Sequence, residues 1–428
     1  MHDRNDGHDV RDVHNGTMER SILVLGAGMV GTCTALHLQQ RGHQVLLIDR
    51  RGPGLETSYG NAGLIQREAV EPYAFPREAG FVLRAALGLG AEVHWHARGL
   101  WQMDGALRRY FHQSEPRRHA RATEAYSRLI GHATDAHAPL IAAAGAEDLV
   151  SREGFRFVFR SAAALAEAVQ RARALESRFG VRHHAEDARA LRLAEPALHG
   201  ALAGAVHWLD PWAVRDPGAL VQRYAQLFQA RGGQLLEGDA QTLRQEGEGW
   251  AVQTAQGPVQ AAQAVLALGP WSDGVLRRLG YRFPLFIKRG YHQHYQGGAS
   301  LGQPVLDAER GYVLAPMAQG LRLTTGAEFA PLQAPPTPVQ LARAEPMARE
   351  LLALGQPVAT PPWLGARPCT ADMLPVMGPA PRHAGLWFNF GHAHQGFTLG
   401  AVAGRLLAQM VAGEPTGIDT VPYSAARF

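Results

Sequence analysis

The sequence predicts an α/β fold of two structural units, and two observations support this prediction. Near the start, a strand-like apolar run (residues 22–25) leads into a glycine turn, a helical pattern and a second apolar run (45–48) that ends at Asp49. Strand, helix and strand in this order are typical of a parallel-sheet unit. The chain has 428 residues, of which 46% are hydrophobic and 19% charged. It can therefore bury a large core, and we expect it to be globular.

The glycine turn reads GAGMVG over residues 26–31. In a dinucleotide-binding turn, the first glycine permits the tight turn, the second lets the backbone approach a pyrophosphate, and the third lets the helix pack on the sheet. The start of the helix also offers N–H groups and a positive dipole end to phosphates. An acid about 20 residues further on can accept hydrogen bonds from ribose hydroxyls, and Asp49 lies close to that spacing.

This unit therefore predicts a dinucleotide site, with a plain glycine-rich turn of an ordinary α/β domain as the alternative reading. A G-x-G-x-x-G motif alone is a weak signal, but one that lies between two strands and is closed by an acid is a strong one. The candidate cofactor-binding residues of this unit are Gly26, Gly28, Met29, Val30, Gly31, Asp49 and Arg50.

Composition limits the other functions that the chain could have. The net charge is only +4, and no basic run is interleaved with aromatic residues, so we expect no nucleic-acid partner. Two cysteines, Cys33 and Cys369, give neither a disulfide framework nor a metal-ligand spacing, and we expect a reducing compartment and no metal site.

Targeting signals also look absent. No apolar run reaches the roughly 18 residues that a membrane helix needs. The first 17 residues are polar and lack the apolar core of a signal peptide, and we expect them to be disordered, with Met18 as an alternative start. These observations favour a cytoplasmic protein.

A loop of small residues follows the second strand and reads ETSYGNAGL over residues 56–64. The backbone can lie close to a flat cofactor where Cβ atoms are absent. Because this loop comes directly after the dinucleotide unit, we expect it to contact the cofactor, although a plain surface loop would read similarly. The candidate residues are Thr57, Ser58, Asn61, Ala62, Gly63 and Leu64.

The middle of the chain alternates between helical and strand patterns. Apolar runs and alternation predict strands at 154–159, 234–236, 250–254, 259–268, 287–295, twice within 311–328, and at 385–389. Helical spacing and helix-forming residues predict helices at 120–144, 161–179, 217–230, 341–354 and 397–411. The apolar strand that ends at residue 268 runs into a turn with Gly269 and Trp271, which we interpret as a second place where the backbone meets the nucleotide.

Two late motifs carry residues suited to an active site. In GARPCTADMLPVMG (365–378), Arg367 lies between small residues and a proline, where its guanidinium could hold a carboxylate in a bidentate pair. A structural ion pair is an equal alternative. In GHAHQGFT (391–398), the amides at the start of the last helix could stabilise negative charge on a reduced cofactor ring. Metal ligation by His392 or His394 is the weaker reading, because no carboxylate or cysteine partner is spaced nearby.

A third motif, KRGYH (288–292), is an aromatic and basic strand. Tyr291, or Tyr312 further along, could line a substrate pocket, and His292 could assist proton transfer. Tyrosines at strand positions are more often packed in a core, so this motif alone does not decide between the two roles.

The ordered motifs resemble the FAD-dependent amine and amino-acid oxidoreductases of the D-amino-acid oxidase superfamily. Within it, the sequence is most similar to bacterial D-amino-acid dehydrogenases and their hydroxyproline and opine relatives. The likeness runs from Ser21 to about Met410 and rests on GAGMVG with Asp49, ETSYGNAG, LGPWS (268–272), KRGYH, GARPCTADMLPVMG and GHAHQGFT. The first motif alone would also fit NAD, whereas the whole set points to FAD.

The resemblance implies a Rossmann-like FAD-binding domain with an antiparallel-sheet substrate domain. We expect residues 18–70, 151–283 and 365–428 to form the FAD-binding domain, and residues 71–150 and 284–364 to form the substrate-binding domain. Residues 1–17 would be a disordered extension.

The resemblance also implies roles for single residues. The ADP half of FAD would lie on the glycine turn and Asp49, the loop 56–64 would follow the pyrophosphate and flavin, and Arg367 would bind the substrate carboxylate. Tyr312 falls where the oxidases place a substrate-side tyrosine. Cofactor contacts near the flavin ring would come from Gly391, Gln395, Gly396, Phe397 and Thr398. Cys369 is out of register with the cysteine that tethers flavin in sarcosine oxidases, so we expect non-covalent FAD.

These roles predict oxidative deamination of a D-amino acid, including D-proline or hydroxy-D-proline type substrates, with hydride transfer from Cα to flavin N5. The alternatives are an oxidase or dehydrogenase of sarcosine-like secondary amines or opines, and an FAD-binding subunit of a larger oxidase. A third alternative is an NAD-dependent dehydrogenase. The electron acceptor stays open between oxygen, a quinone and an electron-transfer protein, and a quinone would bring the protein to the inner membrane surface.

Overall fold

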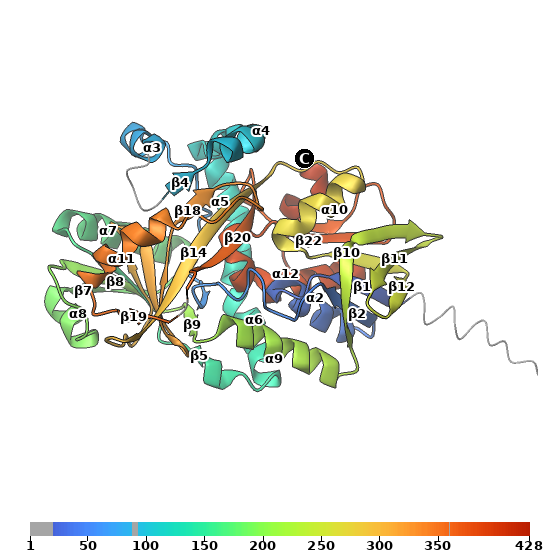
Figure 1. The fold of residues 1–428 in the computed structure, drawn as a ribbon, viewed down its shortest axis with the longest axis horizontal. Helices are drawn as coiled ribbons and strands as arrows, with labels where there is room; N and C mark the ends of the chain where they lie inside the picture. Colours follow the sequence, from blue (N-terminus) through green and yellow to red (C-terminus); the bar gives the residue numbers. More distant parts are fainter. Residues whose placement is uncertain (1–19, 88–92, 359) are drawn as a thin grey trace, which may run out of the picture.

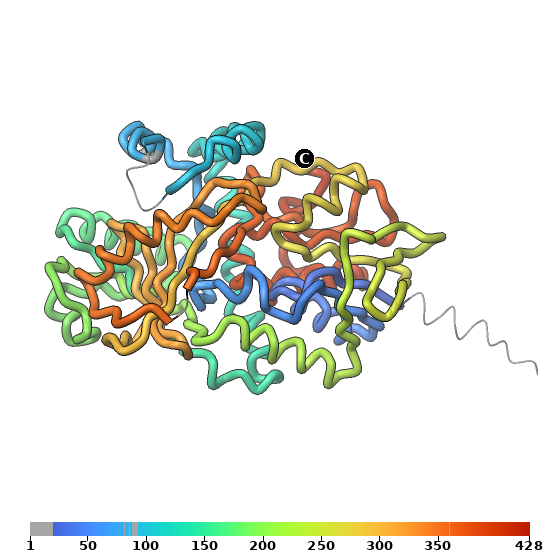
Figure 2. Tube along the Cα trace, in the orientation of Figure 1, coloured from blue at the N-terminus to red at the C-terminus, as the bar shows by residue number. Residues whose placement is uncertain are grey.

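The structure, a computed structural model, describes residues 20–87, 93–358 and 360–428. The expected disordered extension at 1–17 and the alternative start at Met18 lie outside the described residues. The molecule has two lobes, each built on one large β-sheet (Figure 1). The chain crosses between the lobes several times, so segments far apart in sequence share each lobe (Figure 2).

The smaller lobe contains an eight-stranded sheet in the order β12-β11-β10-β2-β1-β13-β22-β21. Its central strands β10, β2, β1, β13 and β22 are parallel, whereas β11, β12 and β21 pair antiparallel at the two edges. The strands are β1 (Ser21–Leu25), β2 (Gln44–Asp49), β10 (Gln234–Glu246), β11 (Gly249–Thr254), β12 (Gly257–Ala261), β13 (Gln263–Leu266), β21 (Val376–Pro379) and β22 (Leu386–Phe390). The predicted α/β fold with its strand–helix–strand start is confirmed.

Helix α2 (Met29–Gln39) connects β1 to β2 and is covered by α12 (Gly396–Val411). The two helices approach closely because α12 carries glycines at the contact: a Cβ on Gly400 would lie 2.5 Å from Met29, and one on Gly404 would lie 2.7 Å from the Thr34 nitrogen. This packing fixes the start of α2, and with it the glycine turn, against the start of α12. Two motifs 370 residues apart are thereby held together.

The larger lobe contains an eleven-stranded, mainly antiparallel sheet organised around the long strand β14. Its main path runs β4-β18-β14-β17-β16-β15-β6-β8-β7, and β19 and β20 also pair with β14. The strands are β4 (Val93–Trp95), β6 (Phe155–Phe159), β7 (His183–Asp187), β8 (Gly204–Trp208), β14 (Leu285–Gly297), β15 (Val305–Asp307), β16 (Tyr312–Met317), β17 (Gly320–Thr324), β18 (Ala327–Phe329), β19 (Gly355–Pro357) and β20 (Trp363–Thr370).

The sheet order corrects the predicted domain boundaries. We assigned residues 151–283 to the FAD-binding domain, but β6, β7 and β8 within that range belong to the larger sheet. Residues 365–370 of β20, which we also placed in the FAD-binding domain, pair with β14 like the rest of that strand. The pairing of β6 with β15 and that of β14 with β20 join segments far apart in the sequence, and strand patterning does not specify the partner.

The remaining described elements surround the two sheets. The helices are α3 (Ala79–Ala86), α4 (Ala97–Gln113), α5 (Pro116–Gly131), α6 (Ala133–Ala143), α7 (Ala162–Phe179), α8 (Ala188–Ala194), α9 (Pro217–Ala230), α10 (Ser272–Arg278) and α11 (Val339–Arg349). A small sheet of β3 (Leu64–Ile65), β9 (Trp212–Val214) and β5 (Val150–Ser151) lies near the junction of the lobes. Among the described helices, none combines the length and apolarity needed to cross a bilayer.

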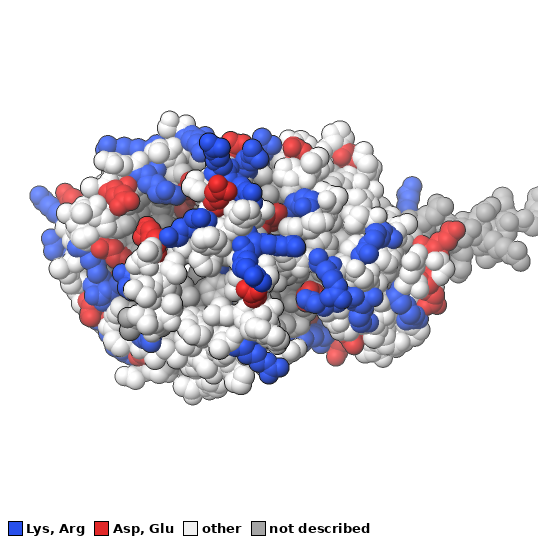
Figure 3. Space-filling view, turned by 90° about the horizontal axis from the view of Figure 1, so that it is seen from above, with Lys and Arg blue, Asp and Glu red and all other residues white. Residues whose placement is uncertain are grey.

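Charged side chains are mixed over the surface. On the face seen from above, arginine side chains are interspersed with aspartate and glutamate side chains (Figure 3). Exposed ion pairs among the described residues include Arg108 with Asp104 and Arg277 with Asp273.

Candidate active site

A cavity of about 820 Å³ is lined by residues of both lobes. The smaller lobe contributes the glycine turn and the loop after β2, and the larger lobe contributes β14, β18 and β20. Parallel-sheet folds bind ligands at the carboxyl ends of their strands, and here the turn after β1 and Asp49 at the end of β2 both line the cavity. The volume is in the range of ligand-binding pockets.

The glycine turn can form only with glycine at two of its positions. Gly26 has a φ of +106°, and a Cβ there would lie 2.5 Å from the carbonyl oxygen of Ala267. A Cβ on Gly31 would lie 1.8 Å from the carbonyl oxygen of Gly26. Gly31 does not line the cavity, and its role is the predicted close packing of the helix on the strand.

Asp49 holds this turn. Its Oδ2 accepts a hydrogen bond from the Ala27 N–H at 2.7 Å, and its Oδ1 accepts one from the Arg51 N–H at 2.9 Å. Burial raises the pKa of this carboxyl, and the two N–H groups oppose that effect. Asp49 therefore fixes the turn as well as lining the cavity, and its contact with a ribose stays a prediction.

The small-residue loop is tied to the same turn. Ser58 Oγ accepts a hydrogen bond from the Met29 N–H at 3.0 Å, so it caps a free amide at the start of α2. Asn61 Oδ1 accepts from the N–H groups of Gly63 and Leu64 at 2.9 and 3.2 Å, and Thr57 donates to the carbonyl of Ala366 in β20 at 3.0 Å. The loop thus connects the two lobes beside the cavity.

Most of the predicted cofactor residues line the cavity. They are Gly26, Gly28, Met29, Val30, Asp49, Arg50, Thr57, Ser58, Asn61, Ala62, Leu64, Gly269, Trp271, Gly391, Gly396 and Phe397. Four others, Gly31, Gly63, Gln395 and Thr398, lie behind this lining. Thr398 Oγ1 accepts from the Gln66 N–H at 3.1 Å, and Gln395 Nε2 donates to the Gln66 side chain at 2.7 Å, so these residues position the lining instead of forming it.

Several features of the lining fit the FAD that the resemblance implies. A Cβ on Gly269 would meet nothing within 4 Å, so a ligand can approach the backbone there, and the Arg50 guanidinium lies 4.3 Å from the Trp271 ring centroid at the same edge of the cavity. Within the described residues, His392 Nε2 and Asn389 Oδ1 are buried without a hydrogen-bond partner although both residues line the cavity. Buried polar atoms are normally hydrogen-bonded, so these two atoms are suited to contact a bound polar cofactor.

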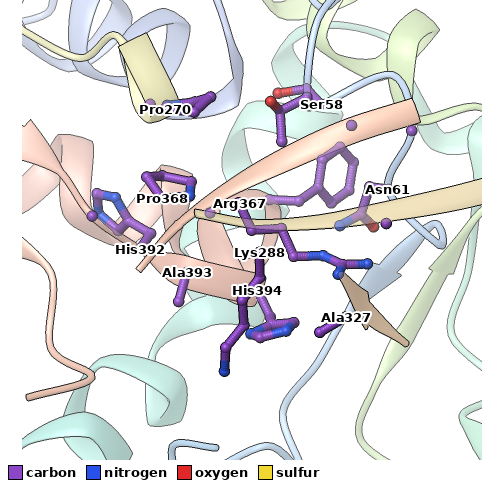
Figure 4. Close-up of a pocket in the computed structure, with 18 of the residues that line it drawn as sticks. Ser58, Asn61, Pro270, Lys288, Ala327, Arg367, Pro368, His392, Ala393 and His394 are labelled. Atoms are coloured by element: carbon purple, nitrogen blue, oxygen red, sulfur yellow. The ribbon is translucent and has the colours of Figure 1, made fainter. Parts of the chain in front are cut away.

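Arg367 occupies the other part of the cavity, in the strand β20 (Figure 4). Its Nη1 donates to the carbonyl of Gly326 at 3.2 Å, and the guanidinium lies over Gly290, where a Cβ would be only 2.5 Å from it. Burial lowers the pKa of this guanidinium. It forms no ion pair with any described Asp or Glu residue, so the structural ion pair that we considered for Arg367 is not observed.

Sequence reasoning missed Lys288 and its surroundings. Lys288 lines the cavity directly across from Arg367 in the β14–β20 pairing. Its Nζ donates to the Tyr110 hydroxyl at 3.0 Å, and His394, whose pKa is lowered by burial and by both cations, lies near it. The motif containing Lys288 was recognised, but Tyr110 lies 178 residues away, and no local pattern reveals that contact.

Two of the predicted catalytic residues are not in the cavity. Tyr312 is buried, and its hydroxyl donates to Asp307 Oδ2 at 3.0 Å and to the Met347 carbonyl at 3.1 Å, so the substrate-side role is wrong for this side chain. His292 is buried against the ring of Trp363 with centroids 4.8 Å apart, and burial lowers its pKa to about 2. A histidine that stays neutral behind the lining is poorly placed for proton transfer.

Tyr291 does line the cavity, but its hydroxyl is engaged elsewhere. It donates to Glu328 Oε2 at 3.1 Å and accepts from the Thr337 N–H at 2.7 Å. Glu328 also pairs with Arg289 at 2.6 Å. Among the described residues, the one cluster with metal-ligand spacing is His94, His96 and Glu328, and these existing partners already occupy its carboxylate.

Comparisons with known proteins agree with this geometry. A family described as "FAD dependent oxidoreductase" matches residues 21–410. The chain is 31% identical to a D-amino acid dehydrogenase of Paramagnetospirillum magneticum, over 95% of this chain and 98% of that protein. It is 33% identical to D-amino acid dehydrogenase 2 of Ralstonia nicotianae, over 95% of this chain and 100% of that protein.

Solved structures share the fold at lower identity. The L-proline dehydrogenase from P. horikoshii has a TM-score of 0.71 at 17% identity, covering 96% of this chain and 98% of that one. The glycine oxidase from Geobacillus kaustophilus has a TM-score of 0.69 at 20% identity, covering 96% of this chain and 98% of that one.

Proposed function

This chain belongs to the FAD dependent oxidoreductase family, and on that premise we propose that it oxidises D-amino acids at the bond between Cα and nitrogen. Its cofactor is FAD, and it is an oxidoreductase. The single observation that carries the substrate proposal is Arg367, a half-buried guanidinium in the cavity wall without a carboxylate partner among the described residues. An unpaired buried charge is costly, and the α-carboxylate of an amino acid would pair with it.

The cavity residues would orient the substrate. With Nη1 engaged by Gly326, the remaining N–H groups of Arg367 are free to hold both oxygens of a carboxylate. The positive charges of Arg367 and Lys288 favour the neutral form of the substrate amine, because a nearby like charge disfavours a protonated amine. No strong base is then required, which agrees with the placement of His292 behind the lining.

When bound, FAD supplies the two-electron acceptor to which Cα of the substrate gives a hydride. The chain's own contribution is to hold the Cα–H bond toward the flavin and to keep the amine uncharged. The product is an imino acid, which water hydrolyses to an oxo acid and ammonia, or a cyclic imine when the substrate is D-proline or hydroxy-D-proline.

We also propose that the flavin is held without a covalent bond. Cys369 is buried beside the main cavity, does not line it, and contacts the carbonyl of Arg367, and Cys33 is buried within α2. Neither thiol lies where the cavity lining would present it to a flavin ring. Acid precipitation of the holoprotein should therefore release all the flavin into the supernatant.

For the electron acceptor, a membrane quinone is the candidate that the surface favours. Trp101 on α4 is 81% exposed and Leu83 on α3 is 62% exposed, and other side chains of these two helices, Val82 and Leu100, line the cavity. Turnover with a short-chain quinone that exceeds turnover with oxygen, together with sedimentation on anionic lipid vesicles, would support this; oxygen turnover at the rate of flavin reduction would refute it.

The proposed activity is tested by mixing the purified holoprotein anaerobically with D-amino acids, L-amino acids, both hydroxyproline epimers, sarcosine and opines. We expect D-amino acids to bleach the flavin band. Bleaching only by sarcosine or opines would favour a secondary-amine oxidoreductase. A protein that contains FAD and is bleached by none of them would instead be an FAD-binding subunit that needs a partner.

A further inference from the structure

Lys288 is the single lysine of this chain, because all other residues among the 42 lysines and arginines are arginine. It lies on the cavity wall and is only 7% exposed. Lysine is a compact ammonium on a flexible stem, whereas arginine is a planar fork. A chain that uses arginine everywhere else therefore has a specific ammonium inside its active-site cavity.

Lys288 and Arg367 are opposite each other in the antiparallel pairing of β14 with β20. Residues directly opposite in such a pair have Cβ atoms about 5 Å apart and point to the same face. In Figure 4 the two side chains start close together and then diverge, Arg367 toward the side of Ala327 and Lys288 past His394. Two positively charged side chains thus start from neighbouring positions on one wall of the cavity.

Neither cation has a negative partner among the described residues. Lys288 contacts the hydroxyl of Tyr110, and its ammonium lies 4.6 Å from the Tyr110 ring centroid and 5.6 Å from that of Phe329. Two other buried arginines are paired with acids: Arg289 with Glu328, and Arg156 with Glu186 and Glu195. A third, Arg322, donates instead to the carbonyls of Tyr59 and Asn61 and to His294. The two cavity cations therefore differ from Arg289 and Arg156, whose charges are neutralised by acids.

Two adjacent cations in a buried wall repel each other and lose hydration. Burial lowers the pKa of Lys288, and the charge of Arg367 lowers it further. The aromatic rings around the ammonium favour its charged form, and an anion bound beside it would do so much more strongly. One carboxylate, on Arg367, would compensate only one of the two charges.

We propose that the substrate carries a second carboxylate, and that Lys288 binds it while Arg367 binds the α-carboxylate. The class is an acidic amino compound whose second carboxylate lies on a short side chain, as in D-aspartate or D-glutamate, or on a short nitrogen substituent, as in N-carboxymethyl amino acids. The short distance between opposite residues of the two strands suits carboxylates separated by a few bonds. This inference rests on the proposed function, since it assigns Arg367 to the α-carboxylate.

The first test compares isosteric pairs that differ only in charge. Anaerobic flavin reduction is measured with D-glutamate against D-glutamine, and with N-carboxymethyl-D-alanine against N-carbamoylmethyl-D-alanine. We expect the charged member to have at least a tenfold higher ratio of reduction rate to dissociation constant. If glutamate and glutamine differ more, the second carboxylate lies on the side chain; if the two N-substituted alanines differ more, it lies on the nitrogen substituent. Equal ratios for charged and neutral members in both arms would overturn the inference.

The second test uses variants. Lys288→Met keeps the length of the side chain and removes the charge, so it should lower the ratio between the charged and neutral substrates about tenfold or more, and Lys288→Arg should restore part of it. Arg231→Met, which removes a positive charge from an exposed position, should leave the ratio unchanged. If Lys288→Met instead slows both members of each pair equally and shifts the pH profile, Lys288 handles the amine proton and the inference is wrong.

The third test does not depend on turnover. Because Lys288 is the single lysine, reductive methylation with labelled formaldehyde gives one lysine NMR signal besides that of the N-terminal amine. Glutarate should shift that signal in the holoprotein, and butyrate, which has one carboxylate, should shift it much less. If glutarate shifts the signal but no amino acid reduces the flavin, the proposed function is wrong and the second anion site is still supported. If glutarate and butyrate shift the signal equally, the second anion site itself is wrong.

Discussion

Replacing Arg367 with methionine should weaken the binding of amino acids strongly while leaving the protein folded. Methionine keeps an unbranched apolar stem without the charge, and removing a half-buried cation that has no acid partner removes a desolvation cost. The guanidinium lies over Gly290 and donates one hydrogen bond to Gly326. The fold therefore loses one hydrogen bond, while the substrate loses its charged partner.

The magnitude follows from the hydrogen bonds that the free N–H groups of Arg367 can form. Hydrogen bonds to charged groups contribute about 1.5–3 kcal/mol, which corresponds to a roughly 10- to 150-fold decrease in kcat/KM. Most of the loss should be in the dissociation constant, because the carboxylate is bound before and during the reaction.

The assay is stopped-flow anaerobic flavin reduction over a range of substrate concentrations, with Arg231→Met as a matched control. A D-amino acid amide, which lacks the carboxylate, should react with the wild type and Arg367→Met at similar ratios of rate to dissociation constant. If Arg367→Met leaves the ratio for the amino acid unchanged, or lowers it equally for the amide, Arg367 does not bind the carboxylate.

Four further substitutions test other parts of the structure. Gly31→Ala puts a Cβ 1.8 Å from a backbone oxygen and should yield protein without flavin colour, whereas Gly105→Ala, which meets nothing within 4 Å, should keep it. Asp49→Ala should weaken FAD binding in a flavin fluorescence titration about tenfold, as expected for loss of hydrogen bonds to a charged group, without changing the order of substrate preference; unchanged retention would refute its role in the turn. Burial lowers the pKa of His137 to about 4, so on acidification the unfolded state binds a proton at this residue before the folded state does. The free energy of unfolding should therefore fall by at most about 3 kcal/mol as the pH decreases from about 6.5 to about 4. In urea denaturation at a series of pH values, His137→Gln should flatten this part of the curve. Tyr312→Phe should cost about 1 kcal/mol of stability and leave kcat/KM unchanged, and a large kinetic effect would restore the substrate-side role.

Local patterns in the sequence predicted the dinucleotide unit well. Gly31 is required by the carbonyl of Gly26 within the same turn, Gly26 has a positive φ, and Asp49 reaches the Ala27 N–H across a single strand–helix–strand unit. Such short-range geometry is repeated wherever the unit occurs, so the residue order is sufficient to recognise it.

The substrate end depends on contacts that sequence patterns do not specify. Tyr312 begins a strand, and the strand places its side chain toward Asp307 and away from the cavity. A shift of one residue in register would reverse that direction, so the pattern alone left the side of the sheet undecided. The wall formed by Lys288, Tyr110 and Arg367 joins three segments, and only the pairing of β14 with β20 and the packing of α4 on β14 bring them together.

The domain boundaries failed for the same reason. We divided the chain by the order of its elements, but β6, β7 and β8, which precede β10 to β13 of the smaller sheet in the sequence, belong to the larger sheet. Apolar alternation indicates that a segment is a strand and gives no information about which sheet it joins.

One measurement tests the central claim most directly: the flavin absorption band of the purified protein, followed anaerobically after addition of a D-amino acid and, separately, of its L-enantiomer. A yellow protein whose flavin band is bleached by D-amino acids, and far more slowly by the L-enantiomers, is the predicted result. A colourless protein that cannot be reconstituted with FAD, or a flavoprotein that neither enantiomer of any amino acid reduces, would contradict it.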